Sequence, residues 1–192
     1  MSDNFLKDGT GKGYLAKVDS VNRLRTFAVT EPLFDVQAFN GEAWNVNTEL
    51  QTISSASETP ILYFKNNEAE PVAVVGWFIG VDAAGATFPG SRQGIMRVYA
   101  GVTGVTGGTD LSVLNRNVGS NRVFDITATL SPTWTPTGTP LLYQTQGTGR
   151  TFGTVYLVVP RGGTLMVTYE WPTYTSGSPL IYTGFTGYVE ED

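Results

Sequence analysis

Two strand-like segments joined by a short glycine-containing turn, residues 151–171, constrain the fold more than any other part of this chain. In the second segment Leu165, Val167, Tyr169 and Trp171 alternate with residues that are mostly polar. Alternation of this kind places one set of side chains on the buried face of a sheet. The first segment, TFGTVYLVV (151–159), is rich in β-branched and aromatic residues, and PRGG (160–163) lies between the two. We predict a β-hairpin here.

The remainder of the chain after residue 44 has the same β character. The 26 Thr, 23 Gly and 10 Pro of the whole chain supply strand formers and turn formers. Strands are predicted at 45–53, 60–66, 73–81, 95–102, 111–117, 123–130, 141–145 and 180–189, with a proline-rich loop at 131–140. One short helix is predicted within 32–44, begun by Pro32 and ended at Asn40-Gly41. The predicted fold is all-β, a jelly-roll-like two-sheet β-sandwich over residues 44–192.

The first 43 residues differ from the body in composition. They hold five of the twelve basic residues: Lys7, Lys12, Lys17, Arg23 and Arg25. Short strands are predicted at 13–19 and 23–31, and neither alternates cleanly enough to bury a face. We predict an extended arm or added hairpin, and a monomer whose arm packs on its own body is one alternative for it.

The chain contains neither Cys nor His. A disulfide scaffold, a thiolate nucleophile, an imidazole base and Cys- or His-ligated metal sites are therefore excluded within it. The sequence also lacks the acidic calcium-loop pattern. We expect no metal and no cofactor, and only carboxylates, Lys, Tyr, Ser and Thr remain for catalysis.

Charge and hydropathy bear on the choice of partner. A net charge of −5 is unsuited to a phosphate backbone, so nucleic-acid binding is not expected. The longest apolar run, residues 71–81, is much shorter than the roughly 20 residues of a membrane-spanning helix. No membrane association is expected either.

Carboxylate pairs are the remaining catalytic candidates, since glycoside hydrolysis uses two of them. The acidic residues of the body are Glu49, Glu58, Glu68, Glu70, Asp82, Asp110, Asp125 and Glu170. Most fall in predicted turns or at strand ends. Asp125 and Glu170 fall within predicted strands and face outward, which favours cross-strand pairing with Arg or Lys. A carboxylate-dependent hydrolase is the least favoured hypothesis.

The aromatic residues are stronger evidence for a binding function than the carboxylates are for catalysis. Trp77 and Trp171 lie in predicted buried positions, whereas Trp134 sits between threonines in the proline-rich loop, with no periodic reason for burial. An exposed ring there is suited to anchor an interface or to stack on a sugar. The alternative is that Trp134 packs the loop onto the body.

The N-terminal part of the chain resembles a group of tailed-bacteriophage virion proteins over about residues 8–75. The matching segments are DGTGKGYLAKVDSVNRLRTFAVTE, NGEAWNVNT and TPILYFKNNEAEPVAV. The resemblance implies a structural protein with a variable β-sandwich, a jelly-roll head decoration (cement) protein that assembles as a trimer on the capsid shell.

The residue types present and the resemblance to virion proteins lead to two hypotheses about function, of which the first is preferred. The first is a non-enzymatic decoration protein on the virion capsid surface, with the major capsid protein and copies of itself as partners. In this hypothesis the basic residues of the arm make the contacts with capsid and neighbouring subunits: Lys7, Lys12, Lys17, Arg23 and Arg25. The alternative is a phage tail, fibre or baseplate protein whose β-sandwich binds a glycan.

Overall fold

The computed structural model describes residues 5–7, 15–17, 33–82, 94–172, 177 and 179–190. The chain divides into two compact units, Met1–Pro32 and Leu33–Asp192. In the first unit β1 (Phe5–Lys7) and β2 (Leu15–Lys17) pair antiparallel. β2 lies within the strand predicted at 13–19, but its partner is β1. The strand predicted at 23–31 lies outside the described residues.

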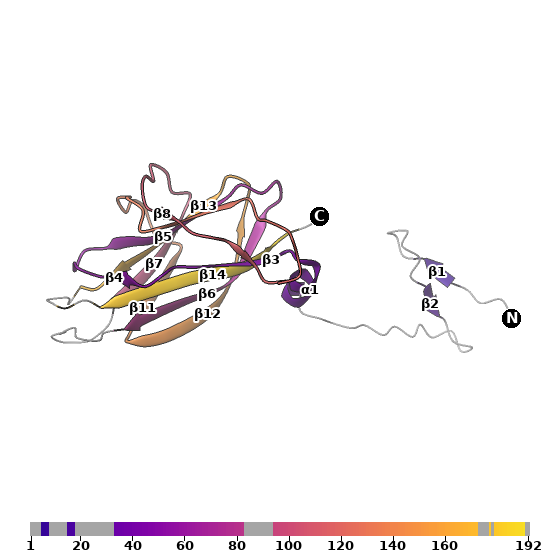
Figure 1. The fold of residues 1–192 in the computed structure, drawn as a ribbon, viewed down its shortest axis with the longest axis horizontal. Helices are drawn as coiled ribbons and strands as arrows, with labels where there is room; N and C mark the ends of the chain where they lie inside the picture. The colour runs from indigo at the N-terminus through magenta and orange to yellow at the C-terminus, as the bar shows by residue number, and fades with distance from the viewer. Residues whose placement is uncertain are drawn as a thin grey trace. The chain divides into compact units, whose positions relative to one another are not determined.

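The second unit is a β-sandwich of two antiparallel sheets, and this confirms the all-β two-sheet prediction (Figure 1). Sheet I contains, in spatial order, β11 (Leu142–Gln146), β7 (Gly94–Ala100), β13 (Thr164–Glu170), β5 (Thr59–Asn66), β10 (Ile126–Leu130) and β8 (Thr109–Asp110). Sheet II contains β12 (Gly149–Val159), β6 (Val72–Asp82), β14 (Leu180–Val189), β3 (Ala43–Asn47) and β9 (Leu114–Asn115). A short strand, β4 (Gln51–Thr52), also pairs with β14.

The predicted short helix is confirmed as α1 (Leu33–Asn40). It ends at Gly41, whose φ of 82° is a left-handed conformation that glycine adopts without steric cost. Ala38 packs against Ala73 and Tyr188. The helix therefore covers one end of the outer face of sheet II.

The long strands pair in a nested order. β7 pairs with β11, β6 with β12, β5 with β13, and β3 with β14. Early strands thus meet late strands, as in one long hairpin whose two halves wrap around the core. The two further pairings, β13 with β7 and β14 with β6, join these pairs into the two sheets.

The hairpin predicted over residues 151–171 is wrong, although both of its strands are present. β12 pairs with β6 in sheet II, whereas β13 lies between β5 and β7 in sheet I. The turn after Pro160 therefore carries the chain from one sheet to the other. Alternation identifies which residues form a strand, but it carries no information about the partner of that strand.

Several other predicted strands are shorter than expected, and the strand predicted at 123–130 begins only at Ile126. The segment 45–53 leaves the ladder at Thr48, whose hydroxyl oxygen accepts a hydrogen bond from the Thr183 N–H. In 111–117 only β9 forms, because the side chains of Asn115 and Asn117 accept hydrogen bonds from main-chain N–H groups two residues ahead. Such local bonds compete with a sheet ladder.

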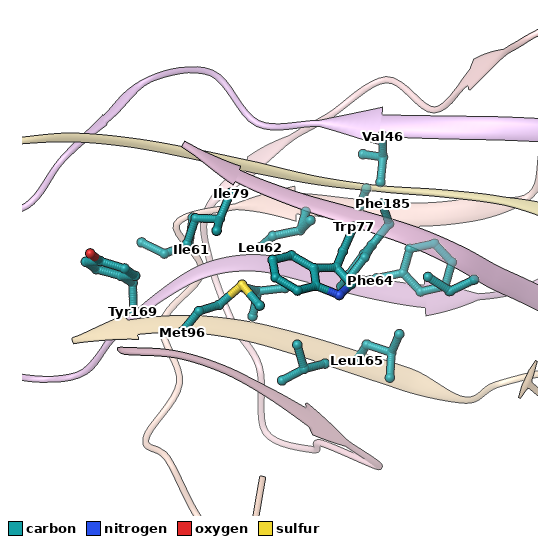
Figure 2. Packing of buried hydrophobic residues seen from close by; sticks show 14 of the residues in the cluster. Val46, Ile61, Leu62, Phe64, Trp77, Ile79, Met96, Leu165, Tyr169 and Phe185 are labelled. Atoms are coloured by element: carbon teal, nitrogen blue, oxygen red, sulfur yellow. The ribbon is translucent and has the colours of Figure 1, made fainter. Parts of the chain in front are cut away.

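The core fills the space between the sheets, and Figure 2 shows side chains from both meeting there. Trp44 of sheet II stacks on Phe64 of sheet I at 5.1 Å between ring centroids, and Phe185 meets Phe64 edge-on at 6.2 Å. Trp77 and Trp171 are buried, as predicted. This close-packed core fixes the two sheets against each other and leaves their outer faces for other contacts.

Candidate functional site

A row of side chains crosses four strands on the outer face of sheet II. Asn47 pairs with Gly184, Gly184 with Phe78, and Phe78 with Phe152. The ring centroids of Phe78 and Phe152 are 6.1 Å apart. Phe152 is 73% exposed and Phe78 is half-buried. The row therefore presents two aromatic rings on one side of a glycine and an amide on the other.

A second row lies on one side of the rings. Asn45 pairs with Thr186, and Thr186 with Gly76. Arg116 reaches this row and donates a hydrogen bond from Nη1 to Thr186 Oγ1 at 3.2 Å. This part of the face is polar, with an amide, a hydroxyl and a guanidinium close together.

A third row lies on the other side of the rings. Tyr182 pairs with Gly80, and Gly80 with Arg150. The Arg150 guanidinium lies 5.3 Å from the centre of the Tyr182 ring and donates a hydrogen bond from Nε to the phenol oxygen. The Tyr182 and Phe78 rings are 5.9 Å apart. An arginine and three rings are thus in contact along this edge of the site.

Glycines in the central strands give these rings their positions. A Cβ atom at Gly184 would lie 2.6 Å from Phe78 Cε1, and one at Gly80 would lie 2.1 Å from Tyr182 Cζ. Each ring occupies the space that a side chain on the neighbouring strand would need. Glycine within a strand commonly marks such a close approach.

The rows enclose a hollow of about 330 Å³, here called the Phe152 groove. Its side chains include Asn45, Asn47, Phe78, Arg116, Phe152 and Thr186. A second hollow of about 300 Å³ shares Asn47, Phe78 and Phe152 with it and continues toward Arg150. The two rings therefore form a ridge between adjoining hollows.

The Phe152 groove has an arginine in its lining, in a chain whose net charge is −5. Arg116 lines it, and no carboxylate is found among the described residues of its lining. Asp82 lines a different hollow, with Arg150 and Tyr182. The groove and the hollow that contains Asp82 are thus lined by different charged side chains.

The second notable surface is the edge strand β12. It pairs with β6 on one side and has no partner strand on the other among the described residues. Tyr156 and Val158 are 62% and 47% exposed, and Arg150 is the only charged residue within the strand. A hollow of about 320 Å³ opens beside it, between β12 and Leu141. Long apolar edges of this kind favour pairing with another chain.

The basic residues predicted in the arm are only partly described. Lys7 ends β1 and Lys17 ends β2, where Lys7 pairs with Leu15 and Lys17 with Phe5. The antiparallel register therefore places the two lysines at opposite ends of this two-stranded sheet. Lys12, Arg23 and Arg25 lie outside the described residues.

Trp134 packs on the outer face of sheet I. Its ring lies 5.2 Å from the Tyr99 ring in an edge-on arrangement, within a cluster that includes Val102 and Met166. The side chain is half-buried. Trp134 is thus at least a packing residue of its loop, and its role as an interface or ligand anchor remains a prediction.

Glu58 and Glu170 are two carboxylates that the fold brings together, as Glu42 and Glu68 are brought together on Arg122. Arg97 bridges them, with Nη1 at 3.2 Å from Glu58 and Nη2 at 2.6 Å from Glu170. The predicted cross-strand pairing of Glu170 is confirmed. Asp125 is exposed and precedes β10 rather than lying within a strand, so its mid-strand placement is wrong. With an arginine between them, Glu58 and Glu170 form a structural ion network.

Sequence reasoning did not single out Phe152 or Phe78. A sequence signal was present in the first segment of the predicted hairpin, where Phe152, Thr154 and Tyr156 lie two residues apart and so share one face of a strand. In the structure all three are exposed. The outer aromatic face follows from the cross-strand register, which places Phe152 beside Phe78.

Groups of three or more acidic side chains arranged to hold a metal ion are absent from the described part of the chain. The described residues also include no helix long and apolar enough to cross a membrane. No protein-family model matches the chain, and no curated protein matches its sequence.

Proposed function

We propose that the protein is a non-enzymatic structural protein of a tailed-bacteriophage virion, a capsid decoration protein that forms a homo-oligomer and binds the major capsid protein. The observation that carries this proposal is the long apolar edge strand β12. Unpaired N–H and C=O groups along an edge are a template for strand addition by a second chain.

The side chains beside this edge suit association between copies. Tyr156, Val158 and Leu141 are large, exposed and apolar. Burying such side chains against a partner is favourable, and contiguous exposed apolar surface is typical of interaction sites. The partner proposed for the edge is a second copy of this chain.

Two further observations support the proposal. The nested pairing of β3, β5, β6 and β7 with β14, β13, β12 and β11 is the order expected of a jelly roll. The separate N-terminal unit, Met1–Pro32, is compatible with an arm that contacts a neighbour. Both agree with the sequence resemblance to virion proteins.

The test compares the wild-type protein with Val158→Lys. The wild type is expected to be an oligomer by light scattering and to co-sediment with capsids that lack decoration protein. A lysine at position 158 adds a charge to the edge and is expected to give a monomer with an unchanged melting temperature. Val118→Lys, at a fully exposed valine outside the long edge strands, is the control. A monomeric wild type that leaves capsids bare would contradict the proposal.

A further inference from the structure

We propose that the hollow between β12 and Leu141 takes the Phe39 side chain of a second copy of this chain, and that Asp35 of that copy faces Arg161 at the rim of the hollow. The inference rests on the proposed association of copies at the β12 edge. It names the element of the second copy that makes the contact, the helix α1.

The hollow is suited to an apolar side chain. Its volume is about 320 Å³, and its lining includes no charged side chain within the described part of the chain. Two of its walls reach water in a single copy, because Leu141 is 55% exposed and Val158 is 47% exposed. Covering these walls with an apolar group removes them from water, which is favourable.

Phe39 is the side chain that fits this hollow. It is 84% exposed, more than any other aromatic ring of the described residues. A large ring with so little contact in its own chain is typical of an interface anchor, and the hollow has room for one such ring. The helix also lies at the right end of sheet II, because Ala38 packs against Ala73, and Ala73 pairs with Val158. Copies placed side by side therefore bring α1 of one to the level of the hollow of the other.

The contact forms only between copies. The hollow opens between the sheets, since it is lined by Val158 of β12 and Leu165 of β13. The helix covers the outer face of sheet II, where Ala38 packs against Tyr188 of β14, and β6 separates β14 from β12. With 84% of its side chain exposed, Phe39 does not fill the hollow of its own copy. Two different surfaces of one chain thus complement each other, which is the basis of contacts between identical subunits.

Charges beside the ring and beside the hollow are complementary. Asp35 precedes Phe39 by four residues in α1, so the two share one face of the helix, and both are exposed. Arg161 is exposed and lies between Pro160 and Gly163, which line the hollow. Neither Asp35 nor Arg161 makes an ion pair with another described residue. Opposite charges placed in this way favour one orientation of the partner and disfavour others.

The experiment measures the mass of the full-length protein by light scattering over a dilution series, which gives the dissociation constant of the oligomer. Phe39→Ala is expected to raise this constant at least about tenfold, as loss of an aromatic anchor does. Asp35→Lys and Arg161→Glu each place like charges across the contact and are expected to raise it about fivefold. The double variant restores opposite charges and is expected to return to within about threefold of the wild type, which also shows that each substituted chain folds. Glu49→Lys, at an exposed carboxylate between β3 and β4, is the matched control and leaves the constant unchanged.

Three results would overturn the contact. One is a wild type that is monomeric at every concentration; if that monomer co-sediments with capsids, capsid binding stands without the contact. Another is an oligomer whose dissociation constant is unchanged by Phe39→Ala, or is not restored by the double reversal. If Val158→Lys still dissociates that oligomer, association at the β12 edge stands and only the role of α1 is wrong. The third is a Phe39→Ala variant that keeps its mass and loses capsid binding, which would assign the ring to the capsid protein instead.

Discussion

The side-chain amide of Asn66 donates a hydrogen bond to the main-chain carbonyl of Val159 at 3.0 Å, and so joins the end of β5 in sheet I to the end of β12 in sheet II. The same nitrogen donates to the Glu70 carbonyl at 3.0 Å, and the amide oxygen accepts from the Glu68 N–H at 2.8 Å. The main chain of Asn66 also bonds to Gly162 and Gly163. One buried residue therefore holds the turn that carries the chain between the sheets.

Asn66→Ala is expected to lower the free energy of unfolding by about 2–4 kcal/mol, because one buried carbonyl, one partly buried carbonyl and one partly buried N–H lose their partner. Urea denaturation measures the loss, with the exposed Asn121→Ala as the matched control. A loss below about 0.5 kcal/mol, the usual range of surface substitutions, would show that water replaces the amide without cost.

Asn66 also explains which part of the fold was predictable. The β-branched and aromatic content of residues 151–159 and the alternation in residues 164–171 predict both strands, because both signals are local. The choice between a hairpin and a crossover depends on contacts with a residue 93 positions earlier. Nothing in the local pattern encodes that contact, so the predicted hairpin was wrong while its strands were right.

Less of the candidate site than of the fold could be predicted from the sequence. Loop position suggested Trp134 as an exposed ring, but Tyr99 from a distant strand provides a packing surface for it. The exposed ring of Phe152 belongs to a strand, and its partner Phe78 lies 74 positions earlier in the sequence. Only the sheet register brings the two together.

The ion network on the outer face of sheet I gives a second prediction. Arg97 is only 16% exposed at its side chain and contacts both Glu58 and Glu170. Arg97→Met leaves two partly buried carboxylates without their cation, and is expected to lower the free energy of unfolding by about 1–3 kcal/mol. Chemical denaturation measures this, with the exposed Arg161→Met as control. Equal stability of the two variants would refute a structural role for the network.

Tyr99 gives a prediction about alkaline pH. Burial, and then its hydrogen bond to Glu58 at 2.9 Å, raise the pKa of Tyr99 from 10.0 to about 12. The folded state therefore holds this proton more tightly than the unfolded state does. The contribution to stability is complete below pH 10 and is lost as pH rises from 10 to 12.

The measurement for Tyr99 compares unfolding free energies of the wild type and Tyr99→Phe across this pH range. Below pH 10 the variant is expected to be less stable by about 1 kcal/mol, for the lost hydrogen bond. Above pH 10 the difference in unfolding free energy between wild type and variant is expected to shrink. In the wild type, unfolded Tyr99 loses its proton at a lower pH than folded Tyr99 does, and this favours unfolding, whereas a phenylalanine at this position has no proton to lose. If the unfolding free energies of wild type and Tyr99→Phe differ by the same amount at all pH values, the raised pKa of Tyr99 is contradicted.

Tyr169 gives the last prediction, a substitution that stabilises the protein. Its side chain is fully buried, its hydroxyl has no hydrogen-bond partner among the described residues, and burial raises the pKa of its phenol. A buried hydroxyl without a partner costs free energy, so Tyr169→Phe is expected to raise the free energy of unfolding by about 1 kcal/mol. Thermal and urea denaturation measure the gain, and Tyr143→Phe, at a ring 54% exposed, is the neutral control. A loss of stability in Tyr169→Phe would instead indicate that a buried water bonds to this hydroxyl and is part of the core.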